Sequence, residues 1–358
     1  MIHDEYAPVA AGPPTGGGGG ELGGGGGGGG ELGGGGGGVS DMAATVVAAP
    51  RVGVGYRSRC GTVERVTALF DRIVVAAWSD ADVPTRGDDS IWRASIDVAS
   101  GEFACVNHAT RHLATKALVA ELSETSGKRV FLGFDFPLGF PGGFAERLVK
   151  PGAAWRSVWT AIDEAVDDHD DNGNNKYAAG AALNSRAGMS PGPFWGCPPD
   201  AEFGSVRAVR PETFLGLPEF RVAERRLAGR GVATPSVWQL HGPGATGGRA
   251  LLGMPLVRDL AERSGLSKRV RLWPFETGCT PVPTRAAGDA IVIGEVWPWS
   301  YELDPTVHSL PDAARAISTA QFLARADRAG RLGQMFDPDL REGERDLVER
   351  QEGWILGA

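Results

Sequence analysis

The stretch Phe131-Leu-Gly-Phe-Asp-Phe-Pro-Leu-Gly-Phe-Pro141 joins an apolar run to a carboxylate. The run from Val130 to Phe134 has the length and composition of a strand that is covered on both faces of a sheet. It stops at Asp135, and Pro137 follows, which has no backbone N–H with which to continue a sheet. Open α/β folds bind ligands at the carboxyl ends of their strands. Asp135 is therefore either a site carboxylate or a turn cap, and this stretch alone leaves both readings open.

Two more acids stand at the ends of predicted elements. The run Ala290-Ile-Val-Ile-Gly-Glu-Val-Trp-Pro298 again places a carboxylate, Glu295, between an apolar strand and a proline. A helix pattern that starts at Pro311 carries Asp312 in its first turn. Magnesium prefers oxygen ligands and is usually held by one or two carboxylates together with waters and substrate phosphates. We therefore predict that Asp135, Glu295 and Asp312 bind Mg²⁺ or Mn²⁺, with caps of turns and helices as the alternative.

The amino-terminal segment differs in composition from the rest of the chain. Residues 16–38 are nineteen glycines interrupted only by two Glu-Leu pairs. Such a tract buries no apolar surface, and glycine loses the most backbone entropy on ordering. We predict that residues 1–65 form a disordered, low-complexity tail and that residues 66–358 form the folded domain. Met42 follows the tract directly and is a candidate alternative start.

The sequence carries no targeting or membrane signal that we recognise. It lacks the basic and apolar regions of a signal peptide, and no apolar run reaches the roughly 18 residues of a membrane span. We therefore expect a cytoplasmic protein without a membrane partner. The formal net charge of −8 falls to −4 without residues 1–51, which hold five acids and one arginine. Residues 207–271 hold twelve Lys or Arg and five acids, so this segment is either a phosphate-facing surface or a solvated helix face.

The order of the predicted elements indicates the fold. We predict strands over residues 72–78, 90–98 and 102–107, a helix over 111–125 that Thr110 caps, and the strand that ends at Asp135. Short strands follow at 273–276 and 290–298, and helices at 311–333 and 338–351. The order β-β-β-α-β is typical of RNase H-like folds. We therefore expect an α/β protein with an RNase H-like mixed sheet and a helical insertion at about 142–270.

The insertion holds the candidate ligand contacts. A helix over 151–168 has Trp155, Val158, Trp159 and Ile162 on one face, which we assign to the core. A glycine loop over 241–249 precedes a helix over 250–263, so its amides could receive a phosphate, although it lacks the ending of a P-loop. We predict Arg221 and Arg249 as phosphate contacts. Trp195, in a loop rich in proline and glycine, is either a ligand contact or a loop anchor.

Several short segments carry a family resemblance. They are Ala77-Trp-Ser79, Asp89-Ser-Ile-Trp92, Gly133-Phe-Asp-Phe-Pro-Leu-Gly139, Gly294-Glu-Val-Trp-Pro298 and Asp312-Ala-Ala-Arg-Ala316. In order and spacing they resemble an uncharacterised bacterial family of predicted RNase H-like nucleases, over roughly residues 72–357. One branch of that family carries labels from cobalamin or molybdopterin biosynthesis, and no residue of this chain supports either pathway.

The resemblance implies a metal-dependent nuclease or phosphoesterase that acts on nucleic acid or a nucleotide. Asp135 and Glu295 match the strand-end carboxylates of the family, and Asp312 matches its helix acid. The family has an aspartate directly before the Trp-Ser pair, where this sequence has Ala77, so Asp80 is the nearest candidate for that role. The implied mechanism is two-metal hydrolysis with Asp135 as the bridging ligand. The alternative is a catalytically decayed module of the same fold that binds a nucleotide, nucleic acid or protein partner.

Overall fold

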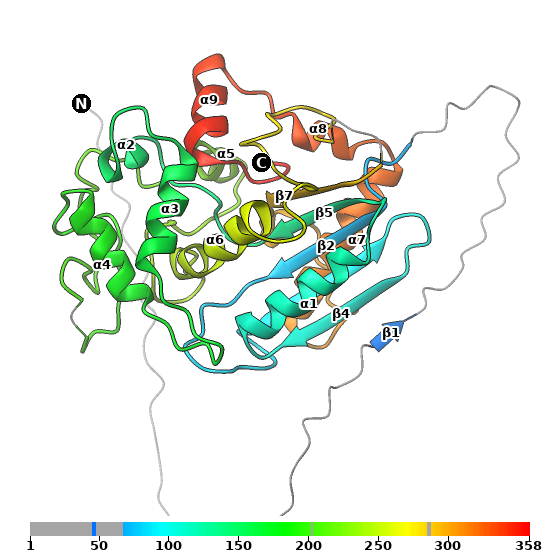
Figure 1. Cartoon of the computed structure of the whole chain (residues 1–358), viewed down its shortest axis with the longest axis horizontal. Coiled ribbons are helices and arrows are strands. Elements are labelled where there is room, and N and C mark those ends of the chain that lie inside the picture. Colours follow the sequence, from blue (N-terminus) through cyan, green and yellow to red (C-terminus); the bar gives the residue numbers. More distant parts are fainter. Residues whose placement is uncertain (1–44, 48–66, 202, 285–287) are drawn as a thin grey trace, which may run out of the picture. The chain divides into compact units, whose positions relative to one another are not determined.

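A computed structural model describes residues 45–47, 67–201, 203–284 and 288–358 (Figure 1). The predicted disorder of residues 1–65 lies outside these residues, except that Thr45–Val47 form strand β1, which pairs antiparallel with β4. The other strands of the sheet are β2 (Arg72–Ala77), β3 (Ile91–Asp97), β4 (Phe103–His108), β5 (Arg129–Phe134), β6 (Val270–Leu272) and β7 (Ala290–Glu295).

The sheet is mixed, and its strand order is β1-β4-β3-β2-β5-β7-β6. Strands β2, β3 and β4 form an antiparallel meander, while β5 runs parallel to β2, and β7 runs parallel to both β5 and β6. The prediction of an α/β protein with a mixed sheet is confirmed. The short strand predicted at 273–276 lies instead at Val270–Leu272, because Pro274 cannot donate a ladder hydrogen bond.

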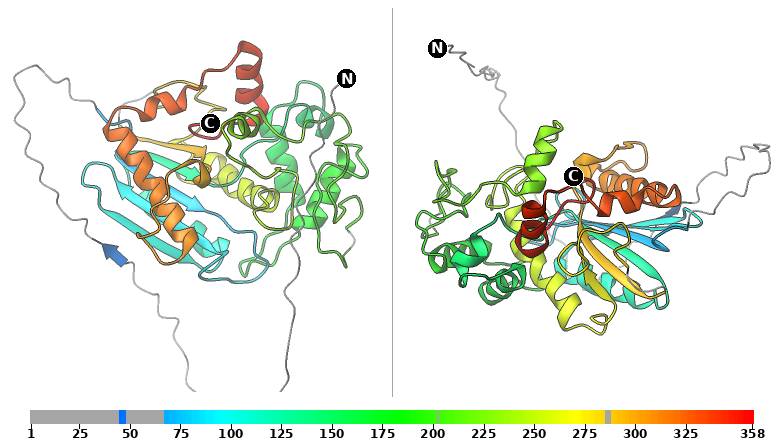
Figure 2. Two further views of the ribbon diagram at one scale, coloured as in Figure 1. Left: turned by 180° about the vertical axis from the view of Figure 1, so that it is seen from behind. Right: turned by 90° about the horizontal axis from the view of Figure 1, so that it is seen from above.

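Helices cover both faces of the sheet. Helix α1 (Arg111–Ser123) lies on one face, and α7 (Pro311–Arg328) crosses the other, as the opposed views of Figure 1 and Figure 2 show. Alternate side chains of β2 enter two different cores: Val74 and Ala76 face the first, and Ile73, Val75 and Ala77 face the second, which includes α7. This alternation decides which strand-end residues share a face.

Helix α1 begins as predicted, because Thr110 Oγ1 accepts the N–H of Leu113 at 3.2 Å. The helical spacing of Leu113, Ala117, Leu118 and Leu122 predicts one apolar face, but the buried face is rotated from it, and Leu113 is 47% exposed. The buried residues are Arg111, Ala114, Leu118 and Leu122. The burial of a charged residue, Arg111, in the first turn was not expected from an apolar pattern.

The segment between β5 and β6 is long, and its regular elements are helices joined by loops. Its helices are α2 (Phe144–Leu148), α3 (Trp155–Ala165), α4 (Lys176–Arg186), α5 (Val222–Gly229) and α6 (Gly247–Glu262). The apolar face of α3 is buried in the core, as its spacing predicted. The chain ends with α8 (Leu332–Phe336), α9 (Glu342–Leu347) and a π-helical turn at Val348–Glu352. No described helix is both long and apolar enough to cross a lipid bilayer.

His108, the last residue of β4, is expected to make stability depend on pH. It is buried, and its Nε2 has no hydrogen-bond partner among the described residues. Burial, aided by Arg93 and Arg86, lowers the pKa of His108 to about 4. The unfolded chain therefore takes up a proton near pH 6.5 that the folded protein resists until about pH 4. Protonation favours unfolding across that window.

The measurement is the thermal midpoint of wild type and His108→Gln between pH 8 and pH 3. Above pH 7 the midpoint difference between the two proteins is expected to be constant. As the pH falls from about 6.5 to 4, wild type should lose stability relative to the variant. A difference that does not change with pH would show that His108 is not held neutral by the fold.

Candidate functional site

A small cavity lies at the edge of the sheet where the parallel strands end. Its volume is about 190 Å³, and we call it the carboxylate pocket. Its charged lining residues are Asp80, Asp89, Asp135, Asp312, Arg249 and Arg315. Four acids and two arginines give a formal charge of −4 + 2 = −2. Such a pocket favours a cation over a free anion.

Asp135 is the most deeply buried acid of the pocket, with 3% of its surface exposed. Its Oδ1 accepts the backbone N–H of Trp78 at 2.6 Å, and its Oδ2 lies 3.0 Å from Nη1 of Arg249. Burial raises the pKa of Asp135, while the charge of Arg249 and the N–H of Trp78 oppose the rise; the nearby charge of Asp312 adds to it. Burial therefore makes the ionised form of Asp135 costly in free energy, and carboxylates with such perturbed pKa values are frequent at functional sites.

Asp312 reaches the pocket from the first turn of α7, as predicted, and meets a residue that sequence reasoning missed. Its Oδ2 accepts the backbone N–H of Asp89 at 3.1 Å. Asp89 has a left-handed backbone with φ of 55°, and its carbonyl accepts the hydroxyl of Ser79 at 2.7 Å. An aspartate tolerates this conformation better than most residues. Asp89 is thereby fixed at the rim, beside Asp312.

Arg315 and Trp299 were also missed, and both line the pocket in contact with each other. The guanidinium carbon of Arg315 lies 4.6 Å from the ring centroid of Trp299, which is 41% exposed. Arg315 follows Asp312 by one helical turn, so the spacing Asp312-Ala-Ala-Arg315 was the available signal. The lining of the pocket thus combines four acids with two arginines and a partly exposed aromatic ring.

Glu295, predicted as a metal ligand, does not face this pocket. The register of β5 and β7 pairs Phe134 with Glu295, so these two side chains share a face. Because successive side chains of a strand alternate, Asp135 points to the opposite face. Glu295 is buried instead against Arg221, with Oε1 at 2.6 Å from Nη2 and Oε2 at 2.8 Å from Nη1. We therefore remove Glu295 from the candidate site.

Arg221, predicted as a phosphate contact, is fully buried. Its five N–H groups donate to the carboxylates of Glu224 and Glu295 and to the backbone carbonyl of Glu352. Burial alone would lower the pKa of Arg221, but the charges of Glu224 and Glu295 outweigh it and raise that pKa. No donor is left for a ligand, so Arg221 has a structural role.

The two other predicted contacts differ in position. Arg249, on the first turn of α6, lines the carboxylate pocket with its guanidinium on Asp135, and its predicted contact with phosphate stays a prediction. Trp195 does not line the pocket. Its backbone N–H donates to the backbone carbonyl of Trp238 at 3.0 Å, and its backbone carbonyl accepts the N–H of Leu240 at 2.8 Å. These bonds support the reading of Trp195 as a loop anchor.

Ala77 occupies the position next to Asp135. Strands β2 and β5 pair Ala76 with Phe134, so residues 77 and 135 follow side by side and point to the same face. Ala77 lines the carboxylate pocket. A carboxylate at this position would adjoin Asp135, and the alanine leaves that place without one.

The pocket fits a divalent cation only in part. Within the described ranges, no three His, Cys, Asp or Glu side chains gather closely enough to hold an ion by themselves. The preassembled two-metal centre that the sequence suggested is therefore absent from this part of the chain. Magnesium, however, is usually bound by one or two carboxylates plus waters and substrate phosphates. Asp135 and Asp312, in a pocket of charge −2, fit a cation that is shared with a phosphorylated ligand.

Comparisons with known proteins leave the assignment to the geometry. No protein-family model matches the chain, and searches of curated proteins and of solved structures give no match.

Proposed function

We propose that this chain is a metal-dependent phosphoesterase or nuclease of the RNase H-like fold, acting at the carboxylate pocket. One observation carries the proposal: Asp135 and Asp312 share a pocket at the carboxyl end of parallel strands with Arg249 and Arg315. The mixed sheet with its antiparallel meander, and the family resemblance of the segments around these residues, support the fold assignment.

The residues of the pocket divide into two kinds. Asp135 and Asp312 would hold the cation, Mg²⁺ or Mn²⁺, and a cation so bound supplies a Lewis acid and a more acidic water at neutral pH. Arg249 and Arg315 would bind the oxygens of the phosphate. Arg249 now neutralises Asp135 at 3.0 Å, so a phosphate that draws Arg249 away would free one carboxylate oxygen as the cation arrives.

A second cavity provides room for the rest of a nucleotide or strand. It has a volume of about 510 Å³ and shares Asp80, Asp89 and Arg249 with the carboxylate pocket. Tyr177 and His241 line it, with the tyrosine hydroxyl 3.1 Å from Nδ1 of the histidine. Its size lies within the range of roughly 300–1,000 Å³ of small-molecule sites. A nucleotide is therefore a suitable ligand in size.

The Asp135→Asn variant is expected to weaken Mn²⁺ binding at least about tenfold, because an amide oxygen cannot replace the charge of a carboxylate. The measurement is calorimetric titration of the full chain with Mn²⁺, in the presence and absence of inorganic phosphate. Phosphate is expected to tighten Mn²⁺ binding to wild type. Asp346→Asn, an exposed acid on α9, is the control. A wild type that binds no Mn²⁺ in either condition would refute the proposal.

A binding module without catalysis is the second candidate, and Ala77 favours it. A site that lacks one carboxylate beside Asp135 can retain a cation and a phosphate without promoting hydrolysis. Hydrolysis of bis-p-nitrophenyl phosphate, measured with Mn²⁺, separates the two. Turnover that Asp135→Asn abolishes indicates the enzyme, and Mn²⁺ binding without turnover of this or a nucleic acid substrate indicates the binding module.

A further inference from the structure

The Asp80 carboxylate, which lines the carboxylate pocket, lies unusually close to the backbone of helix α6. A Cβ atom added to Gly248 would lie 2.2 Å from Oδ2 of Asp80, closer than any real Cβ contact. Gly248 stands in the first turn of α6, where the helix dipole stabilises a negative charge. Any side chain at position 248 would therefore have to push the Asp80 carboxylate away.

A buried lysine holds the same residue from the insertion. Lys176 is 4% exposed, and its ammonium has three protons to place. Nζ donates to the carbonyl of Asp80 at 2.6 Å and to Oδ1 of Asp82 at 2.9 Å, and it lies 3.4 Å from Oδ2 of Asp80. Burying a lysine is costly unless it is paired, and here the hydrogen bonds and ion pairs of its ammonium all go to Asp80 and Asp82.

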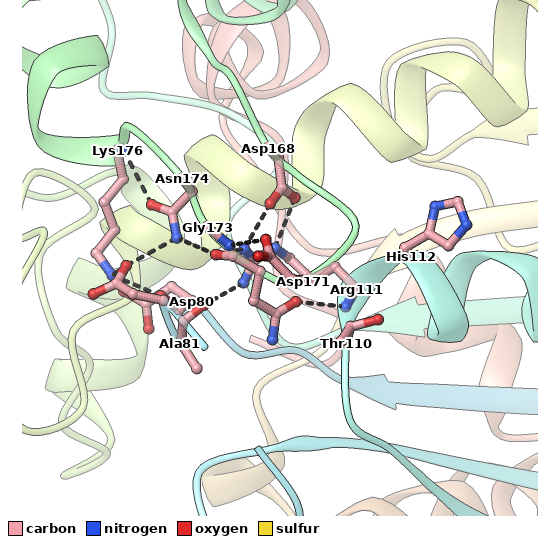
Figure 3. A network of polar contacts seen from close by, with 12 residues as sticks. Asp80, Ala81, Thr110, Arg111, His112, Asp168, Asp171, Gly173, Asn174 and Lys176 are labelled. Atoms are coloured by element: carbon pink, nitrogen blue, oxygen red, sulfur yellow. Dashed lines mark hydrogen bonds and ion pairs between the residues drawn. The ribbon is translucent and has the colours of Figure 1, made fainter. Parts of the chain in front are cut away.

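Arg111 fixes that segment from the other side (Figure 3). It is 2% exposed, and its Nη1 donates to the carbonyls of Ser79 at 3.2 Å and of Ala81 at 2.9 Å. Its remaining N–H groups donate to both oxygens of Asp168 and to the carbonyl of Asn172. Figure 3 shows Lys176 and Arg111 converging on the segment with Asp80 and Ala81. The buried guanidinium of Arg111, in the first turn of α1, thus holds the segment through the backbone carbonyls of Ser79 and Ala81.

The polar loop over residues 167–175 completes this arrangement. Asn172 is 1% exposed, and its Nδ2 donates to the carbonyls of Val83 and Ala109 at 3.1 and 3.2 Å. Asn174 donates to Oδ1 of Asp82 at 2.9 Å. A loop rich in acids and amides therefore serves as a fixed support for residues 79–83 and not as a free ligand site.

We propose that Gly248, Lys176 and Arg111 are positioning residues, which hold the Asp80 carboxylate in the pocket to supply the acid that Ala77 lacks. The placement follows from the contacts above, and the role of the placed carboxylate rests on the proposed function. Asp80 lies three residues beyond position 77 and lines the pocket with Asp135 and Asp312. An acid on the loop after β2 therefore lines the same pocket as Ala77, at the end of that strand.

The test is a double-mutant cycle of Gly248→Ala and Asp80→Ala in the full chain, with Mn²⁺ affinity and the thermal midpoint as readouts. Gly248→Ala and Asp80→Ala are each expected to weaken Mn²⁺ binding about tenfold, and the double variant no further. Gly248→Ala should lower the midpoint in wild type, yet leave it unchanged or raise it in Asp80→Ala, where no carboxylate is displaced. The matched control is Gly343→Ala on α9, where an added Cβ meets nothing within 4 Å.

Lys176→Arg and Lys176→Met extend the test. The arginine variant keeps a buried donor for Asp80 and should retain more Mn²⁺ affinity than the methionine variant. If Asp80→Ala and Gly248→Ala bind Mn²⁺ as tightly as wild type, while Asp135→Asn does not, this inference is overturned and the proposed function stands. If wild type binds no Mn²⁺ with or without phosphate, the proposed function and the assigned role of Asp80 both fail.

Discussion

Replacing Arg221 by methionine is expected to lower the free energy of unfolding by about 3–5 kcal/mol, which is the usual cost of removing one partner of a buried ion pair. The substitution fills similar volume, so packing changes little. It leaves the carboxylates of Glu224 and Glu295, both almost fully buried, without their cation. A domain of this kind has a total stability of roughly 5–15 kcal/mol, so the variant is expected to be marginal.

The cost cannot be relieved locally, because the start of α5, the end of β7 and the carboxyl-terminal turn all meet at Arg221. Its Nη1 donates to the carbonyl of Glu352, whose own carboxylate accepts the N–H groups of Gly142 at 2.8 Å and Val222 at 2.6 Å. Glu295 in turn accepts the N–H of Leu138 at 3.2 Å. The start of α5, the end of β7 and the carboxyl-terminal turn therefore lose a common partner together, and the segment after β5 is bound to two of the affected acids, Glu295 and Glu352.

Urea unfolding, followed by fluorescence, is the measurement. Arg225→Met is the matched control, because Arg225 lies on the same helix and is exposed, and its effect is expected to stay within about 0.5 kcal/mol. If Arg221→Met does not fold, Glu295→Gln provides the second variant, since it keeps the shape and removes one charge of the pair. Equal unfolding midpoints for Arg221→Met and Arg225→Met would contradict the structural role of Arg221.

Asp135 and Glu295 show how far a strand pattern can be read. Both stand at the end of an apolar run, and both strands were predicted at nearly the right residues. The runs are apolar on both faces, so they contain no alternation that reveals where the next side chain points. A shift of one residue in register exchanges the faces, and only the assembled sheet fixes the register. The position of Asp135 was therefore predictable as an edge residue, but its separation from Glu295 was not.

Features that depend on residues close in sequence were predicted more accurately than contacts between distant residues. Thr110 caps α1 through a hydrogen bond to a residue three positions away, which the sequence displays directly. Asp89 meets Asp312 across 223 positions, and Arg221 meets Glu295 across 74. Nothing in a basic helix pattern distinguishes a solvated arginine from one whose partners come from another strand. Of the predicted site residues, the carboxylate pocket contains Asp135, Asp312, Asp80 and Arg249. Glu295, Arg221 and Trp195 lie elsewhere, because their partners are set by the tertiary fold.

The variant Ala77→Asp is expected to be less stable than wild type without metal and to recover that stability when Mn²⁺ is added. Position 77 adjoins Asp135, faces the carboxylate pocket and is 8% exposed. Burial already raises the pKa of Asp135, with Asp312 adding to the effect, so a third acid adds like-charge repulsion. We expect a loss of about 1–3 kcal/mol without metal. Mn²⁺ at a hundred times its dissociation constant should return about 2.7 kcal/mol.

Thermal midpoints of Ala77→Asp and Ala77→Asn, each with and without Mn²⁺, give the measurement. The asparagine has the same size without the charge, so it should lose stability through crowding and recover little with Mn²⁺. Cleavage of bis-p-nitrophenyl phosphate adds the functional outcome. Activity that appears only in Ala77→Asp would identify a decayed nuclease. If wild type is active and Ala77→Asp does not improve it, Asp80 already provides the missing carboxylate. If Mn²⁺ leaves the thermal midpoint of Ala77→Asp unchanged, no metal binds beside Asp135, because a cation bound there must stabilise the added carboxylate.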